Sequence, residues 1–317
     1  MKYKIFEQQA LDFLTLDPNF CASNGVEKNL GDLPDPGKNQ RLKTQGKLKM
    51  FNKLLKEVEA QDKQEEQDLK LWALYFEQMR LDLELEIDQV PKIMRLPHAF
   101  GEIVDPIFLF FINDPRPASA RIINIISRLN KSMSYIQSYV KNLRTPVKRW
   151  VEIELDAISG FDTFASSLRE WAEKENFPKL NLLDDAITTA KSAFQFYKRF
   201  LEDIDKTENF FLGEDQMKQV IAARGIELDP SDIHLIAKEF LKENADEVEN
   251  LRFKLVEKYS LSSETDAAKL QEFLSEKFAT PYNDFEDIIT RYQKEQENIL
   301  NWLSERKLFP IFENQTL

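Results

Sequence analysis

The sequence predicts an all-α fold, a bundle of long and mostly antiparallel helices whose breaks are marked by proline and glycine. Three observations lead to this prediction. Apolar residues recur at alternating spacings of three and four along several stretches, which is the period of one helix face. Proline-containing breaks separate these stretches. The 317 residues include only 8 glycines, which is few for a β-protein rich in turns.

An irregular segment is expected after the first helix. Residues 14–36 read LTLDPNFCASNGVEKNLGDLPDP and are dense in Asp, Asn, Gly and Pro. Pro18 is expected to end the first helix, since proline cannot continue one. The glycines and prolines that follow should then steer a backbone that crosses the helical body. Whether this segment also contacts a substrate stays open.

A basic helix is predicted next. Residues 38–56 hold seven lysines and arginines before the next acid, opposite a stripe that contains Leu48, Phe51, Leu55 and Val58. The favoured interpretation is a helix that packs on the core and leaves its charged face in water. A basic amphipathic helix that binds an anionic surface or an acidic partner is the alternative.

The stretch that follows carries a long apolar stripe and one conflicting signal. The stripe consists of Leu69, Trp72, Phe76, Met79, Leu83, Ile87 and Val90. Within it, residues 81–88 read LDLELEID, and this strict alternation also suits a half-buried strand. We predict helix here, because Leu and Glu are strong helix formers and the stripe runs through the segment.

Two heptad seams predict the centre of the bundle. The first consists of Ile122, Ile126, Leu129, Met133, Ile136, Val140 and Leu143, and the second of Leu183, Ile187, Ala190, Phe194, Tyr197, Leu201 and Ile204. Helices with such seams pack lengthwise at a shallow angle. A further stripe contains Phe285, Ile289, Tyr292, Ile299 and Leu303. We expect residues 1–317 to form one helical region, with a subdivision near 205–213 as an option.

Composition and charge narrow the function classes. With 42% hydrophobic and 31% charged residues the chain is typical of soluble globular proteins. A net charge of −12 repels polyanions, so nucleic acid is not an expected partner. One cysteine and the lack of an export signal favour the cytoplasm. The longest apolar run, residues 107–112, is too short to span a membrane.

The sequence offers little catalytic chemistry, and we assign no catalytic, cofactor-binding or metal-binding residue. Its two histidines, His98 and His234, are far apart, whereas a catalytic zinc usually needs three protein ligands. Each has a glutamate nearby, Glu102 and Glu239 respectively, yet a structural role is favoured for both histidines. Cys21 has no flanking motif of a nucleophile.

Several motifs together give a resemblance over nearly the whole chain. They are FLTLDPNFCASNGVEKNLGDLPDP with Leu16, Asp17, Pro18, Gly25, Leu33, Pro34 and Asp35; RPASARIINIISRLNKSMSYI with Arg121, Arg128 and Leu129; KNLRTP with Asn142, Leu143 and Pro146; and FFLGEDQMKQVIAARGIELDPSDI with Phe211, Leu212, Gly213, Glu214 and Pro230. In this order they resemble the N-terminal part of the microbial domain-of-unknown-function 885 family.

The resemblance implies an all-helical protein similar to zinc-dependent peptidases of the angiotensin-converting and thermostable carboxypeptidase type. In that family a His-Glu-x-x-His helix lies in the second half, and this chain has no such motif. The catalytic C-terminal half is therefore expected to be absent, and zinc is expected only there. A fragment, a natural truncation and one subunit of a split enzyme remain open.

Two functional hypotheses follow. In the first, the chain is the non-catalytic helical half of a metallopeptidase-like hydrolase and forms one wall of a substrate cleft. In the second, it is a stand-alone helical scaffold or interaction module without enzymatic activity. The expected partner is the missing catalytic half, or a second copy that binds through an apolar surface near residues 285–312, including Trp302 and Phe309.

Overall fold

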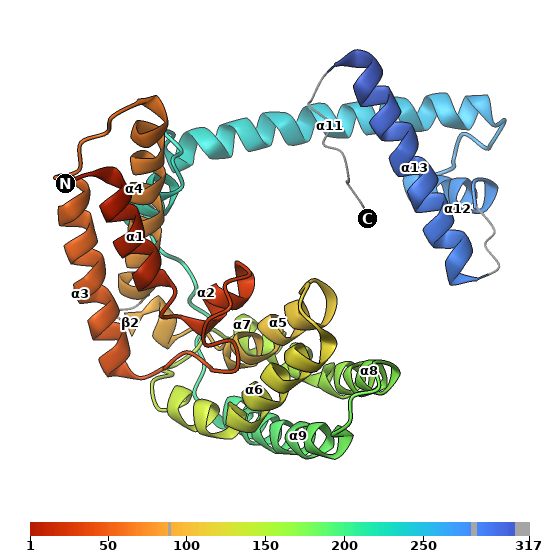
Figure 1. Cartoon of the computed structure of the whole chain (residues 1–317). Coiled ribbons are helices and arrows are strands. Elements are labelled where there is room, and N and C mark those ends of the chain that lie inside the picture. The colour runs from red at the N-terminus through yellow and green to blue at the C-terminus, as the bar shows by residue number, and fades with distance from the viewer. Residues whose placement is uncertain (88–89, 280–283, 308–317) are drawn as a thin grey trace. The chain divides into compact units, whose positions relative to one another are not determined.

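The computed structural model describes residues 1–87, 90–279 and 284–307 (Figure 1). Its contacts divide the chain into two compact units, a first unit of Met1–Ile233 and a second unit of His234–Leu317. The described elements are almost all helices, which confirms the predicted all-α class. No described helix is long and apolar enough to cross a membrane.

The helices of the first unit are α1 (Tyr3–Leu14), α2 (Pro18–Ser23), α3 (Lys38–Leu55), α4 (Lys63–Glu84), α5 (Ala99–Ile112), α6 (Ala118–Tyr139), α7 (Lys148–Ser159), α8 (Phe161–Lys174), α9 (Leu180–Asp203) and α10 (Glu214–Ala223). Strands β1 (Glu86–Ile87) and β2 (Val90–Pro91) and the 3₁₀ helix η1 (Lys92–Met94) lie between α4 and α5. Helix α11 (Pro230–Lys258) continues into the second unit, which also holds α12 (Ala267–Lys277) and α13 (Phe285–Arg306).

The two predicted seams form the main core. Helices α6 and α9 make the most extensive contact between any two helices, and α5, α7 and α8 pack around them (Figure 1). The seam residues that are buried are Ile122, Leu129, Ile136, Leu143, Leu183, Ile187, Ala190, Phe194, Tyr197 and Leu201. Ile126, Met133, Val140 and Ile204 are partly buried against them. The prediction of lengthwise packing is confirmed.

A second, aromatic core joins α1, α3 and α4. The Phe51 ring stacks on Phe76 with 5.1 Å between centroids, and Phe6 meets both rings edge-on. Such ring pairs add to the stabilisation that burial alone provides. Helix α3 buries Leu48 and Phe51 in this core, as the favoured interpretation of the basic stretch predicts.

The helical prediction for residues 81–88 is wrong beyond Glu84. Helix α4 ends there, Leu85 is extended, and β1 pairs antiparallel with β2, so that Ile87 faces Val90 in the ladder. Pro91 provides a physical reason, because the residue before a proline is biased to extended conformations. The Leu85 carbonyl accepts a hydrogen bond from the Lys92 amide, which closes the hairpin.

The start of the chain also differs from the prediction. Helix α1 ends at Leu14, and Pro18 does not end it but is the first residue of α2. Proline suits that position, since the first helical amide has no partner in any case. The Asp17 carboxylate caps α2 by accepting from the amides of Asn19 (2.7 Å) and Phe20 (3.4 Å).

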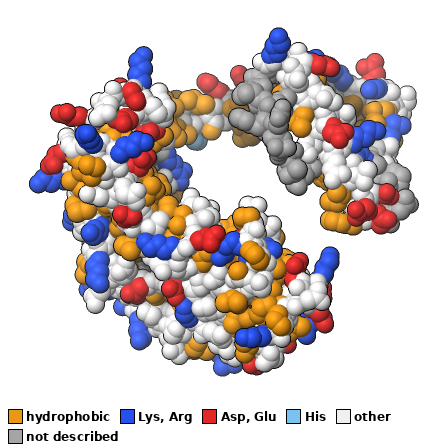
Figure 2. Space-filling view, in the orientation of Figure 1, with side chains coloured by type: hydrophobic (Ala, Val, Ile, Leu, Met, Phe, Trp, Pro, Cys, Tyr) orange, Lys and Arg blue, Asp and Glu red, His pale blue; other side chains and the backbone are white. Residues whose placement is uncertain are grey.

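The second unit buries few side chains. Val256 and Leu270 are buried, and no described residue of α13 is. Figure 2 shows hydrophobic side chains among the charged ones on its surface. The exposed apolar residues of α11 and α13 are Leu235, Ile236, Phe240, Leu241, Val248, Leu251, Phe253, Phe285, Ile289, Tyr292, Ile299 and Trp302. Phe309 and the rest of residues 308–312, which belong to the predicted apolar surface, lie outside the described residues.

Candidate functional site

A cleft of about 1140 Å³ lies in the first unit. Its walls come from the irregular segment of residues 14–36, the start of α3, the end of α4, residues 92–98 and one face of α6. This volume is slightly larger than that of most small-molecule sites in proteins. This cleft is the candidate functional site.

Helix α6 fixes the irregular segment through its polar side chains. Ser127 and Lys131 both donate to the Gly31 carbonyl, at 2.7 and 2.8 Å, and Asn142, just beyond α6, donates to the Pro36 carbonyl at 3.1 Å. A Cβ atom at Gly31 would lie 3.1 Å from the Ser127 Cβ, so this close approach favours glycine. The segment therefore crosses the helical body along α6, as expected.

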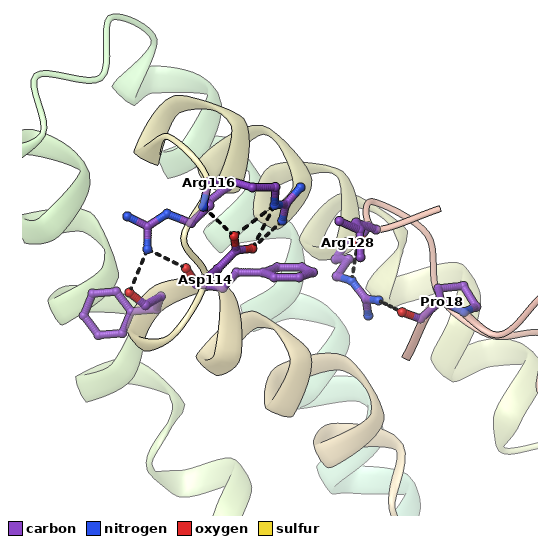
Figure 3. A network of polar contacts seen from close by, with 8 residues as sticks. Pro18, Asp114, Arg116 and Arg128 are labelled. Atoms are coloured by element: carbon purple, nitrogen blue, oxygen red, sulfur yellow. Dashed lines mark hydrogen bonds and ion pairs between the residues drawn. The ribbon is translucent and has the colours of Figure 1, made fainter. Parts of the chain in front are cut away.

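Arg128 of α6 makes the most hydrogen bonds to this segment. Its guanidinium is completely buried and donates to the carbonyls of Leu30 (2.7 Å) and Pro18 (3.2 Å) and to the Asn19 side-chain oxygen (2.8 Å). Figure 3 shows Arg128 reaching Pro18 from α6. Burial lowers the pKa of Arg128 to about 10, so it stays charged at neutral pH.

A separate pair of arginines fastens the turn between α5 and α6. Arg116 forms an ion pair with Asp114 (Figure 3). Arg121 donates to the Phe110 carbonyl at 3.0 Å. The Arg121 guanidinium also lies 4.9 Å from the centre of the Trp171 ring. The motif arginines Arg121 and Arg128 thus hold backbone in place.

Asn19 connects the buried Arg128 to the cleft. Its side-chain oxygen accepts from Arg128, while its amide donates to the Glu102 carboxylate (2.6 Å) and to the Glu102 carbonyl (3.0 Å). Glu102 lies in the first turn of α5 and lines the cleft. The α2 segment therefore positions an acid at the cleft floor.

The amino end of α5 is held by groups from three other helices. Its first residues donate to Glu154 of α7 (from Phe100, 2.9 Å) and to Tyr197 of α9 (from Ala99, 3.5 Å). Tyr139 accepts from the His98 amide at 3.0 Å and donates to the Leu96 carbonyl at 2.5 Å. This scaffold holds His98 and Glu102, which both line the cleft.

Glu154 gives the first testable prediction. Burial raises its pKa to about 7 from the ordinary 4.5, although the Phe100 amide partly opposes the shift. The folded state therefore holds this proton where the unfolded chain has lost it, so stability falls as pH rises from about 4.5 through about 7. Relative to wild type, the free energy of unfolding of Glu154→Gln should therefore increase by about 1–3 kcal/mol between pH 4.5 and pH 8.

Urea unfolding of both proteins at several pH values measures this difference. Glutamine keeps the side-chain oxygen that accepts from Phe100, so the fold should persist. As a control, Glu152→Gln changes an exposed acid on the same helix and should leave the pH dependence of wild type. A constant difference between Glu154→Gln and wild type across this pH range contradicts the assigned pKa.

The structure places the sequence candidates in different surroundings. His98 lies at the cleft, whereas His234 is exposed on α11. Cys21 is buried, and its thiol donates to the Thr15 carbonyl at 3.3 Å. Within the described ranges, no group of three His, Cys, Asp or Glu residues could hold a metal ion.

Sequence reasoning missed Glu154 and Tyr135 as parts of this region. Glu154 lies on the buried stripe of α7, between Val151 and Ile158, where an apolar residue is the usual choice. An acid at a position of the buried stripe was therefore the sequence feature that could have indicated a buried functional carboxylate. Tyr135 precedes seam residue Ile136, so its place at the cleft needed the three-dimensional arrangement of α6 and α2.

The comparisons with known proteins agree with the fold. A family described as a bacterial protein of unknown function, DUF885, matches residues 18–315. A solved structure, described as "a putative lipoprotein of unknown function from Shewanella oneidensis", is similar over 99% of this chain with 16% identity and a TM-score of 0.66. This chain covers 59% of that structure's length. No curated protein matches the chain significantly.

Proposed function

The chain belongs to the DUF885 family, and from that premise we propose that it forms the non-catalytic helical wall of a substrate cleft in a metallopeptidase-like hydrolase. The cleft of about 1140 Å³ is the observation that carries the proposal. The expected ligand is an unfolded peptide, and the catalytic zinc and its ligands would belong to a further segment. The cytoplasmic location stays a prediction from the single cysteine.

The chemistry of the lining supports a peptide ligand. Acids of the irregular segment, such as Asp32 and Asp35, face the cleft together with bases such as Lys38 and Arg41, so neither sign dominates. Aromatic side chains, including Phe20 and Tyr75, supply apolar contact area. A peptide offers amides, carbonyls and mixed side chains, and such a lining can satisfy all of them.

The length of the related structure supports a catalytic segment that is separate from the peptide-binding one. This chain covers 59% of that longer protein, which leaves room for a further segment in it. The family resemblance implies that a His-Glu-x-x-His helix occupies such a segment. By this proposal, the present chain binds peptide but does not cleave it.

Fluorescence anisotropy with a fluorescein-labelled decapeptide of mixed sequence tests this proposal. We expect saturable binding and, with added zinc, no cleavage detectable by mass spectrometry. Ser134→Trp should abolish binding, because Ser134 is an exposed residue of α6 that lines the cleft. Gln137→Trp is the matched control, since Gln137 is exposed on α6 outside the cleft. Equal binding by both variants, or zinc-dependent cleavage by the chain alone, contradicts the proposal.

A second candidate is a stand-alone scaffold that binds a partner through the second unit. The observation in its favour is the exposed apolar surface of α11 and α13, together with a groove of about 480 Å³ lined by residues of α11 and α12 such as Leu255 and Leu274. The simplest partner is a second copy in a two-fold dimer. Light scattering should then show association that Trp302→Glu weakens.

A further inference from the structure

We infer that the cleft floor binds the free amino terminus of a peptide, with Glu102 binding the ammonium group and Tyr135 binding the first carbonyl. This inference rests on the proposed function, because it assumes that the cleft accepts peptides. It adds the end of the peptide that is recognised and the two side chains that recognise it.

Glu102 supplies a carboxylate with one oxygen left for a ligand. The Asn19 amide donates to Oε2 at 2.6 Å, and in the described part of the chain no hydrogen bond or ion pair involves Oε1. Burial raises the pKa of Glu102 and the charge of Asp17 raises it further, while the neighbouring His98 and the hydrogen bond from Asn19 act in the opposite direction. A ligand cation would stabilise the ionised carboxylate, because a buried charge is costly without a partner.

Asn19 also keeps the Arg128 charge from neutralising Glu102 directly. The guanidinium donates to the Asn19 oxygen and to two backbone carbonyls, and in the described part of the chain none of its hydrogen bonds reaches a carboxylate. Arg128 therefore orients Glu102 through an amide instead of pairing with it. Asp17 also lines the cleft and is close enough to interact electrostatically with Glu102, so it adds a second negative charge. The floor is thus suited to a monocation.

Tyr135 supplies the second contact. It is 6% exposed, lines the cleft, and its hydroxyl has no hydrogen-bond partner among the described residues. The neighbouring Tyr139 ring stacks beside it with 6.0 Å between centroids, but the Tyr139 hydroxyl is already bonded to residues 96 and 98. In the described part of the chain the Tyr135 oxygen is not among the fully buried polar atoms that lack a partner, so the hydroxyl is accessible from the cleft and can donate to a ligand acceptor.

The two groups together favour one chemical class. Glu102 accepts from an ammonium group, and the Tyr135 hydroxyl donates to an oxygen. A peptide amino terminus has both features in its first residue, an ammonium group and the carbonyl that follows it. A lysine side chain has the ammonium without an adjacent carbonyl, so it should bind more weakly. N-acetylation of the peptide removes the positive charge.

Two versions of one lysine-free hexapeptide test the inference, each with fluorescein at its carboxyl end. One has a free amino terminus and the other is N-acetylated. Because a charge-assisted hydrogen bond is stronger than a neutral one, we expect wild type to bind the free form at least about tenfold more tightly. Glu102→Gln should abolish this preference. Tyr135→Phe should weaken binding of the free form about three- to tenfold.

A third peptide, acetylated but containing one lysine, separates the two sources of an ammonium group and should bind like the acetylated form. Asp82→Asn is the control, because Asp82 lines the cleft at α4 and should not affect the preference. Equal binding of the free and acetylated peptides by wild type overturns this inference and leaves the proposed function standing. Binding of neither peptide overturns both. The wild-type comparison needs no variant, so it is decisive even if a variant fails to fold.

Discussion

Arg128→Ala is expected to destabilise the first unit by about 3–5 kcal/mol, because the change removes three hydrogen bonds from a buried site. One of the acceptors is the backbone carbonyl of Leu30, which would be left without the donor that it has in the folded chain. The irregular segment should detach from α6 as a result. Arg128→Lys keeps the charge but cannot donate in three directions from one plane, so it should be destabilised too.

Urea unfolding followed by tryptophan fluorescence measures this effect, since Trp72, Trp150 and Trp171 all lie in the first unit. Lys131→Ala is the matched control. Lys131 also reaches the segment from α6, through Gly31 and Asp32, but its side chain is 43% exposed. Its loss should cost about 1 kcal/mol or less. Similar effects of the two substitutions would refute the central role of Arg128.

Leu129→Ala is expected to cost about 2–5 kcal/mol, because it leaves a cavity in the centre of the contact between α6 and α9. Leu129 is completely buried in the main core. Leu201→Ala, on the facing helix α9, should have an effect of the same size for the same reason. Both values are changes in the free energy of unfolding from urea titrations.

The control for this pair is Ile123→Ala on α6. Ile123 is 59% exposed, so its removal should change stability by no more than about 0.5 kcal/mol. If Leu129→Ala and Ile123→Ala have equal effects, the seam is not the core of the first unit. The pair thus tests the packing independently of the cleft.

The helical core could be predicted because local spacing encodes it. Residues three and four apart on one helix face must be buried together, and the seams of α6 and α9 follow this rule with few exceptions. The hairpin after α4 could not be predicted in the same way. There, the stripe through Ile87 and Val90 has helical spacing, but Pro91 and the pairing of the two strands determine the backbone.

The candidate site depends on contacts between distant parts of the chain. Arg128 and Asn19 are 109 positions apart, and Phe100 and Glu154 are 54 apart. No periodicity reports such pairs. The sequence did indicate a special backbone path in residues 14–36, because glycine, proline and aspartate punctuate it. The sequence did not predict that Arg128 binds this segment, because an arginine on α6 is expected to be an exposed surface residue.

Photo-crosslinking tests the central claim, that the cleft of the first unit binds peptide, most directly. A decapeptide with a free amino terminus and one benzoylphenylalanine would be irradiated with the wild-type chain, and the attached residues identified by mass spectrometry. The account predicts attachment to residues that line the cleft, such as Leu33, Met94 and Tyr139, and its loss in Ser134→Trp. Attachment to the exposed apolar residues of α11 and α13, unchanged in Ser134→Trp, would contradict it and favour the scaffold.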